Sequence, residues 1–180
     1  MHKQGWALYN RLLNSHPILS RSVTSCLGLM AGDLLAQAAA RKPYSRERTL
    51  RFAAFGFVLH GPGLYAFYTN LDKFVFPNDR FSTKTVITKV VIDQCVWAPS
   101  FTCVFYAFMK AMERKSHETG KTIREKFWPT LTAGYSFWVP AHLVNYRLIP
   151  PAQRVLYVNA VNIIWNAILS TIAEKKEHKV

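Results

Sequence analysis

The sequence predicts an all-α protein, a polytopic membrane helical bundle of four to five hydrophobic helices with an N-terminal interfacial helix. Two observations predict it: where the charged residues fall, and how long the uncharged stretches are. Of the 33 charged residues (23 Lys and Arg, 10 Asp and Glu), 31 lie outside five segments of nineteen or twenty residues. A hydrocarbon core of about 30 Å needs about 20 residues of helix, so these lengths match a bilayer.

The five hydrophobic segments belong to one predicted membrane domain, residues 1–180. They are residues 22–40, 52–71, 90–109, 127–146 and 155–173. Helices of soluble proteins average about 11–12 residues and carry charge on one face, so five buried core helices of a soluble domain explain the pattern less well. The mean hydropathy of +0.02 conceals this arrangement because it averages the segments with their charged connections.

The connections between the segments differ in basic charge. Residues 41–51 and 110–126 hold five and six Lys or Arg, whereas the N-terminal arm up to Pro17 holds two, Lys3 and Arg11, and residues 72–84 hold three. The positive-inside rule therefore places the two more basic loops on one side, facing matrix or cytosol, with the N-terminus opposite.

The N-terminal arm carries no acidic residue before Asp33. Trp6, Tyr9 and Leu13 share one helical face, and Pro17 is expected to end the helix. An apolar secretory signal is absent, and the acid-poor composition resembles mitochondrial targeting. We expect this arm to form an interfacial helix.

The net charge of +13 indicates an anionic partner. No base-stacking platform accompanies it, so we expect membrane lipid, including cardiolipin, and no nucleic acid. The candidate lipid-headgroup residues are Arg46, Arg48, Arg124 and Lys126. The three cysteines all lie in predicted spans and form no CxxC or Cys/His pattern, and no nucleophile–base set appears. We therefore predict no metal, no cofactor, no catalytic residue and no enzymatic activity.

A stripe of small residues marks one face of the first segment. Gly28, Gly32, Ala36 and Ala40 recur every fourth position. Such a stripe lets a second helix approach closely in lipid, so these four are the candidate helix-packing residues.

Polar residues inside the segments are the candidate cavity-lining set. They are Asp33, Gln37, His60, Asp93, Gln94, His142, Asn145, Asn159, Asn162 and Asn166. A charged residue at mid-helix costs about 2.5–3.5 kcal/mol on insertion scales, so it faces protein or water. The same groups could instead be interhelical clasps worth about 0.6 kcal/mol each, and for the Asn stripe both readings stay open. Lys89 lies one turn before Asp93 and is expected to neutralise it, which leaves Asp33 as the candidate unpaired charge.

Prolines are expected to interrupt three segments. The sequence His60-Gly61-Pro62-Gly63 falls in the second segment, Pro99 in the third and Pro140 in the fourth. Broken backbone at membrane depth persists where it lines a cavity or is buried in protein, although the prolines could equally be packing kinks.

The chain resembles the Mpv17/PMP22 family of small mitochondrial inner-membrane and peroxisomal membrane proteins, from about Trp6 to Ser170. The resemblance rests on an ordered set of short motifs, each weak alone. They are Gly32-Asp33 with Gln37; Gly61-Pro62, Phe67-Tyr68 and Leu71-Asp72; Asp93-Gln94 with Pro99; Trp128-Pro129, Trp138, Asn145-Tyr146, Pro150 and Arg154; and Trp165-Asn166 with Leu169-Ser170. The chain departs from the family at Tyr65 and Phe67, where family members usually have His and Trp. It also has Trp138-Val139-Pro140 and then His142, where family members usually have Trp-Pro and then Gln.

The resemblance implies a protein of the mitochondrial inner membrane or, alternatively, of the peroxisomal membrane. Family members are generally described as having four spans, so the fifth segment is either a span or a packed terminal helix. Some members are regarded as non-selective or weakly cation-selective channels linked to metabolite balance, mitochondrial DNA upkeep and oxidative stress. Two functions are therefore expected: a small-solute channel, or a non-conducting accessory subunit, as a homo-oligomer or in a larger inner-membrane complex.

Overall fold

The computed structural model describes residues 2–40 and 43–177, with side chains for residues 4–40 and 43–166. Over these residues the regular structure is helical, without strands, which confirms the predicted all-α class. In chain order the helices are α1 (His2–Ser15), α2 (Pro17–Ala39), α3 (Arg46–Phe55), η1 (Gly56–His60), α4 (Gly61–Phe74), α5 (Thr83–Ile92), η2 (Asp93–Trp97), α6 (Ala98–Met112), η3 (Ser116–Glu118), α7 (Thr119–Leu148), η4 (Pro151–Gln153) and α8 (Arg154–Glu177). Each of the five hydrophobic segments lies within helix over its whole length or all but one residue.

Two π-turns, η1 and η2, join α3 to α4 and α5 to α6 into continuous helices. In these turns the amide of Gly61 donates to the carbonyl of Gly56, and the amide of Ala98 donates to that of Asp93, five residues back. In both cases a proline, Pro62 or Pro99, is the next residue after the donor. Because proline has no N–H and clashes with the carbonyl four residues back, a locally wider turn accommodates it without ending the helix.

The predicted interruptions therefore take another form. The chain is not broken at Pro62 or Pro99 but widened just before each of them. The prediction of an interruption at Pro140 is wrong, because α7 runs continuously through both Pro129 and Pro140. Neighbouring helices and local adjustments can re-satisfy the freed carbonyls in such a helix.

Two helices of the described chain are long and apolar enough to cross a membrane. They are α2, with 23 residues, and Thr83–Met112, with 30 residues, and their most apolar 18-residue windows have mean hydropathies of 1.2 and 1.3. In their most apolar windows 33% and 17% of residues are buried, unlike the core helix of a soluble protein. Large apolar side chains accordingly face outward on both helices: Leu27, Leu34, Leu35, Ile87, Val91 and Val96 are exposed by 41–58%. For the other three segments the membrane assignment stays a prediction.

The helices form two compact units, residues 1–66 with 151–180 and residues 67–150, and the division falls within α4. The prediction of a single membrane domain stays a prediction.

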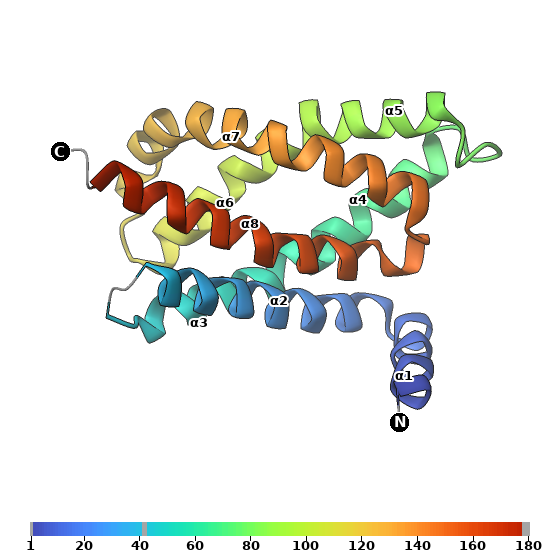
Figure 1. Cartoon of the computed structure of the whole chain (residues 1–180), viewed down its shortest axis with the longest axis horizontal. Helices are drawn as coiled ribbons and strands as arrows, with labels where there is room; N and C mark the ends of the chain where they lie inside the picture. Colours follow the sequence, from blue (N-terminus) through green and yellow to red (C-terminus); the bar gives the residue numbers. More distant parts are fainter. Residues whose placement is uncertain (1, 41–42, 178–180) are drawn as a thin grey trace. The chain divides into compact units, whose positions relative to one another are not determined.

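In unit 1, α2 lies beside α8, and the two helices run in the same direction (Figure 1). The helices α3 and η1 run antiparallel to α2 (Figure 1). Two glycines let the chain after α3 approach α2 closely. A Cβ at Gly56 would lie 2.5 Å from the carbonyl oxygen of Ser25, and one at Gly61 would lie 2.5 Å from that of Arg21. Both clashes are with backbone, which no side-chain rotation can relieve, so this contact requires glycine.

The first helix turns sharply from α2 after Ser15, at the position where Pro17 predicts its end (Figure 1). Arg21 holds this corner: its Nη1 donates to the carbonyl of Pro17 at 2.9 Å and to that of Leu13 at 3.4 Å. The first segment was predicted to start after Arg21, but α2 begins earlier and includes it. The residue is tolerated there because its guanidinium donates to a carbonyl in the last turn of α1 and to the first carbonyl of α2.

In unit 2, the helix from α5 to α6 packs antiparallel against α7. Near one end of this pair, Tyr106 and Thr130 share a hydrogen bond of 2.6 Å between their hydroxyls. Lys110, in the last turn of α6, donates to Glu118 Oε2 at 2.8 Å, which helps to fix the entry into α7. This hydrogen bond lowers the pKa of Glu118.

Candidate functional site

The first buried polar cluster surrounds Asp33 on α2. Gln37 Nε2 and Thr49 Oγ1 each donate to Asp33 Oδ2 at 2.7 Å, and Gln37 also donates to Thr49 Oγ1 at 2.9 Å. Gln37 further accepts from the amide of Ser45, which caps the first turn of α3. The four-residue spacing that grouped Asp33 with Gln37 holds, and α3 adds Thr49 to the cluster.

Asp33 is also ion-paired. Arg48 Nε lies 2.7 Å from Asp33 Oδ1, with the carboxylate fully buried and the arginine side chain 44% exposed. The prediction that Asp33 is an unpaired charge is therefore wrong. The reason is that α3 folds back along α2, which brings the first turn of α3 to a depth where Arg48 reaches an acid fifteen residues earlier.

Lys89 likewise has a different partner from the one its spacing suggests. Its Nζ lies 2.6 Å from Asp72 Oδ1, and the lysine side chain is fully buried. The expected neutralisation of Asp93 by Lys89 is thus wrong. Asp72 directly follows the second segment and meets Lys89 because α4 and α5 run antiparallel around the turn at residues 77–79.

The second buried polar cluster surrounds Asp93, the first residue of η2, which is 1% exposed. Tyr146 donates its hydroxyl to Asp93 Oδ2 at 2.7 Å, and Gln94 Nε2 donates to Oδ1 at 3.1 Å. His142 Nε2 lies 3.5 Å from the same Oδ1. Two of these three neighbours, Tyr146 and His142, come from α7, so Asp93 connects the π-turn to that helix.

An aromatic ladder on α7 supports this cluster. The His142 ring stacks between the rings of Trp138 and Tyr146, with centroid distances of 5.4 and 6.0 Å and interplanar angles of 28° and 30°. The three residues are spaced four apart, which aligns them along one face. Beyond them, Asn145 Nδ2 donates to the hydroxyl of Tyr68 at 3.3 Å. His142 Nδ1 and Asn145 Oδ1 are buried and have no hydrogen-bond partner among the residues that the structure describes.

A third polar cluster joins three helices of unit 1. Asn159 Nδ2 on α8 donates to Ser25 Oγ on α2 at 2.9 Å, and His60 Nδ1 at the end of η1 lies 3.3 Å from the same oxygen. All three side chains are at most 4% exposed. Here the prediction that His60 and Asn159 lie at buried polar positions matches the geometry, and the arrangement fits an interhelical clasp.

The small-residue stripe of α2 faces α8. A Cβ at Gly28 would lie 2.7 Å from Asn159 Cβ, and one at Gly32 would lie 2.7 Å from Asn166 Nδ2. Ala36 is buried, while Ala40 is half-buried beyond the last turn of α2. Farther along α8, Asn166 Nδ2 donates to the carbonyl of Asn162 at 2.9 Å. The asparagines thus occupy the space that glycine leaves open.

The four predicted lipid-headgroup residues are all exposed. Arg46 and Arg48 lie in the first turn of α3 in unit 1, and Arg124 and Lys126 lie in the first turns of α7 in unit 2. Only Arg48 among them makes an ion pair in the described part of the chain. Their binding to lipid stays a prediction.

The structure groups the predicted cavity residues by unit. Unit 1 holds Asp33, Gln37, His60, Asn159, Asn162 and Asn166, and unit 2 holds Asp93, Gln94, His142 and Asn145. Sequence reasoning missed the residues that complete the clusters, namely Ser25, Arg48, Thr49, Asp72 and Tyr146. Among the described residues, no three His, Cys, Asp or Glu side chains come together as metal ligands. A lining role of these residues in a cavity stays a prediction.

Comparison with known proteins gives the family. The sequence profile described as the Mpv17 / PMP22 family matches residues 110–170. Protein SYM1 of Mycosarcoma maydis is 35% identical over 145 residues, which cover 77% of this chain and 71% of the relative. Protein sym1 of Aspergillus oryzae is 33% identical, with coverages of 91% and 95%. Peroxisomal membrane protein 2 of Bos taurus is 27% identical, with coverages of 92% and 88%.

No solved structure matches the chain. The two localisations expected from the resemblance, the mitochondrial inner membrane and the peroxisomal membrane, are both represented in this family. With two relatives above 30% identity across most of their length, an all-α fold and helices able to cross a membrane, the chain is a membrane protein that belongs to the Mpv17 / PMP22 family.

Proposed function

We propose that the protein is a pore-like channel for small solutes in the mitochondrial inner membrane, weakly selective for cations, that supports metabolite balance. The proposal is for a non-enzymatic protein without cofactor. Family membership supports the membrane setting, and the conducting role rests on the arrangement of the Asp93 cluster.

The observation that carries the proposal is the buried carboxylate of Asp93 within a helix that is apolar enough to cross a membrane. The helix Thr83–Met112 is apolar enough to cross a membrane, yet it widens into η2 at a buried carboxylate. π-turns inside α-helices occur frequently at functional sites, and ionisable residues within spans are rare and mark ion or substrate pathways. Tyr146 and Gln94 are neutral donors, and His142, whose Nε2 lies 3.5 Å from Oδ1, pairs with the carboxylate charge only when it is protonated. A fixed negative charge in low dielectric favours cations over anions.

Conductance in planar bilayers tests this function. We expect purified wild-type protein to carry current and to show a reversal potential that favours cations across a KCl gradient. Asp93→Asn keeps the shape of the side chain and removes its charge, so cation preference should fall. Asp33→Asn is the matched control: because Arg48 already neutralises Asp33, selectivity should stay unchanged. Equal loss in both variants, or in neither, would contradict the assignment to Asp93.

A second function, a non-conducting accessory subunit, is favoured by a different observation. Most buried polar groups find partners within their own unit: Asp33 with Arg48, Lys89 with Asp72, and Asn159 with Ser25. Groups paired in this way can act purely as clasps. If wild type carries no current while Asp93→Asn only lowers stability, the accessory role is the better description.

Localisation and assembly belong to the same proposal. The inner membrane is the proposed site, and the peroxisomal membrane is the alternative suggested by the bovine relative's name. Organelle fractionation with alkaline carbonate extraction should leave the protein in the mitochondrial membrane pellet. Size-exclusion chromatography with light scattering would then distinguish a homo-oligomer from a subunit of a larger complex. Recovery in the carbonate supernatant would contradict the membrane assignment.

A further inference from the structure

The side chain of Arg48 contacts a buried acid at one atom and is exposed over much of the rest. Its Nε lies 2.7 Å from the buried carboxylate of Asp33, while 44% of the side chain is exposed. Its guanidinium lies 5.7 Å from the ring of Phe52. Among the described residues the two terminal nitrogens of Arg48 have no hydrogen-bond partner. An arginine that uses Nε inward therefore presents its other two nitrogens outward.

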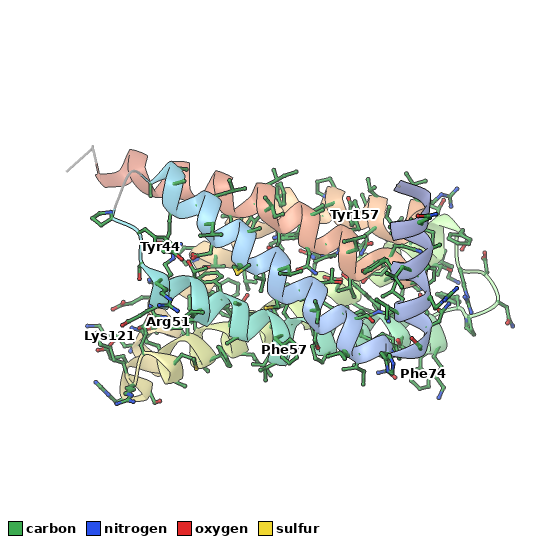
Figure 2. The ribbon with its side chains drawn as sticks, turned by 90° about the horizontal axis from the view of Figure 1, so that it is seen from below. Tyr44, Arg51, Phe57, Phe74, Lys121 and Tyr157 are labelled. Atoms are coloured by element: carbon green, nitrogen blue, oxygen red, sulfur yellow. The ribbon has the colours of Figure 1, made fainter. Side chains whose placement is uncertain are left out.

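The surroundings of Arg48 are basic and amphipathic. Of the charged residues in the stretch 41–51, five are Lys or Arg and one, Glu47, is acidic. Tyr44 and Leu50 are 58% and 54% exposed beside the arginines. Figure 2 shows Tyr44 and Arg51 at the end of unit 1 where α2 passes into α3. Exposed tyrosine, leucine and arginine together are typical of a membrane–water interface.

We propose that Arg48 bridges the buried Asp33 and the phosphodiester group of an anionic membrane lipid. A guanidinium is planar and can bind two oxygen acceptors at once through its fork, whereas a lysine ammonium acts as a single point charge. Asp33 orients the fork, and Gln37 and Thr49 hold Asp33. Arg46, exposed two residues before Arg48, adds charge to the same headgroup.

The position of the site favours a lipid over a soluble phosphate. Arg48 follows α2, which is apolar enough to cross a membrane, within nine residues of its end at Ala39. Arginines near the ends of spanning helices reach out to the headgroup level. The inference rests on membrane insertion and does not require the protein to conduct.

Lipid retention in nanodiscs tests the bridge. Nanodiscs are prepared from phosphatidylcholine alone and from phosphatidylcholine with cardiolipin, and bound cardiolipin is counted by native mass spectrometry. A single basic residue near a membrane surface contributes about 1 kcal/mol, or roughly a fivefold change in binding. We expect Arg48→Gln to lower cardiolipin binding by more than fivefold. Arg48→Lys keeps the charge but not the fork, and we expect it to lower cardiolipin binding by a clear part of that factor.

Arg80→Gln is the matched control, since it removes the same charge from an exposed site on the loop at residues 72–84. Equal losses in Arg80→Gln and Arg48→Gln, with Arg48→Lys behaving as wild type, would overturn the bridge. If Arg48→Gln does not fold, the double variant Asp33→Asn/Arg48→Gln, which leaves no buried charge, is used in its place with the same expected loss.

The source of the phosphate is tested separately. We expect inorganic phosphate added in detergent to leave the thermal unfolding midpoint of wild type unchanged, and cardiolipin to raise it. If inorganic phosphate alone raises the midpoint of wild type but not of Arg48→Gln, the site takes soluble phosphate and the lipid assignment fails. Because none of these measurements is a current, the bridge and the channel can fail independently.

Discussion

The two buried carboxylates in the described part of the chain, Asp33 and Asp93, are stabilised in different ways. In unit 1, Asp33 receives a cation from the surface, and two neutral donors satisfy its second oxygen. In unit 2, Asp93 is held by Tyr146 and Gln94, both neutral, with the imidazole of His142 at 3.5 Å. The first acid is paired with a permanent cation, whereas the second is held by neutral donors beside an imidazole that is charged only when it is protonated.

This difference separates a structural acid from a candidate functional one. The ion pair between Arg48 and Asp33 joins α3 to α2 and neutralises the electric field of the Asp33 carboxylate in the interior. Where His142 is neutral, the donors around Asp93 leave the field of its carboxylate in place, which is the property that ion selectivity needs. Burial alone does not distinguish the two, because both residues are 1% exposed.

The largest expected effect comes from breaking the ion pair of unit 1. Arg48→Gln leaves Asp33 as a buried charge without a cation, which costs about 3–5 kcal/mol when a buried pair loses one partner, with the lower end expected because Arg48 is half exposed. Asp33→Asn/Arg48→Gln should recover much of the loss. Unfolding in mixed micelles with sodium dodecyl sulfate measures both. A double variant no more stable than Arg48→Gln would show that the pair is not what stabilises this end.

Unit 1 is also expected to be sensitive to any added side chain at its close helix contact. Gly56→Ala places a Cβ 2.5 Å from a backbone oxygen of α2 and should cost about 3 kcal/mol, at the upper end for overpacking. The matched control is Gly120→Ala in the first turn of α7, where a Cβ meets nothing within 4 Å. That change should be neutral or stabilise by about 0.5–1 kcal/mol. Similar unfolding curves for the two variants would contradict the close contact.

The neutral donors of unit 2 predict a smaller loss. Tyr146→Phe removes one hydrogen bond to the Asp93 carboxylate, and a bond to a charged group contributes about 1.5–3 kcal/mol. The aromatic ladder with His142 should persist, since phenylalanine keeps the ring. Unfolding in mixed micelles gives the loss, and near-ultraviolet circular dichroism follows the aromatic packing. A loss as large as that of Arg48→Gln would mean that Asp93, too, depends on a single partner.

The smallest effect is expected at Glu118, outside the spans. Lys110 donates a hydrogen bond that lowers the pKa of Glu118 below its ordinary value of 4.5. A carboxyl whose pKa is lower in the folded state stabilises the fold fully above its ordinary pKa, and the contribution disappears as the pH falls through the lowered value. The free energy of unfolding of wild type should be slightly larger at neutral than at acidic pH because of this carboxyl, and Glu118→Gln should make that difference only slightly smaller. A change as large as that of Tyr146→Phe would place Glu118 in a buried network, against its exposure.

The fold was predictable because a helix that crosses a membrane excludes charged residues along its length. Thirty-one of 33 charges lie outside five segments, and that pattern alone predicts an all-α membrane bundle. The positions of Asp33, His60, Asp93 and Asn159 in the interior followed for the same reason, since each was a polar residue in an apolar segment.

Their partners were not predictable in the same way. Four-residue spacing identifies neighbours on one helix, and it correctly joined Asp33 to Gln37 but wrongly joined Lys89 to Asp93. The partners Arg48, Asp72 and Tyr146 come from other helices, and their proximity depends on how the chain turns between them. One signal was available: a proline lies two residues beyond each π-turn, so Pro62 and Pro99 mark η1 and η2 in advance.

Each π-turn holds one residue more than a regular helix would need at that point. Because the wider turn absorbs that residue, removing it from η2 would let the helix close with regular turns of about 3.6 residues, and Phe101 and Tyr106 would keep their faces. A deletion in the regular turns of α6 has no wider turn to absorb it, so it would rotate the following side chains about 100° around the helix axis. The surface that α6 presents to α7 therefore tolerates the loss of one residue at η2 but not a few residues farther along.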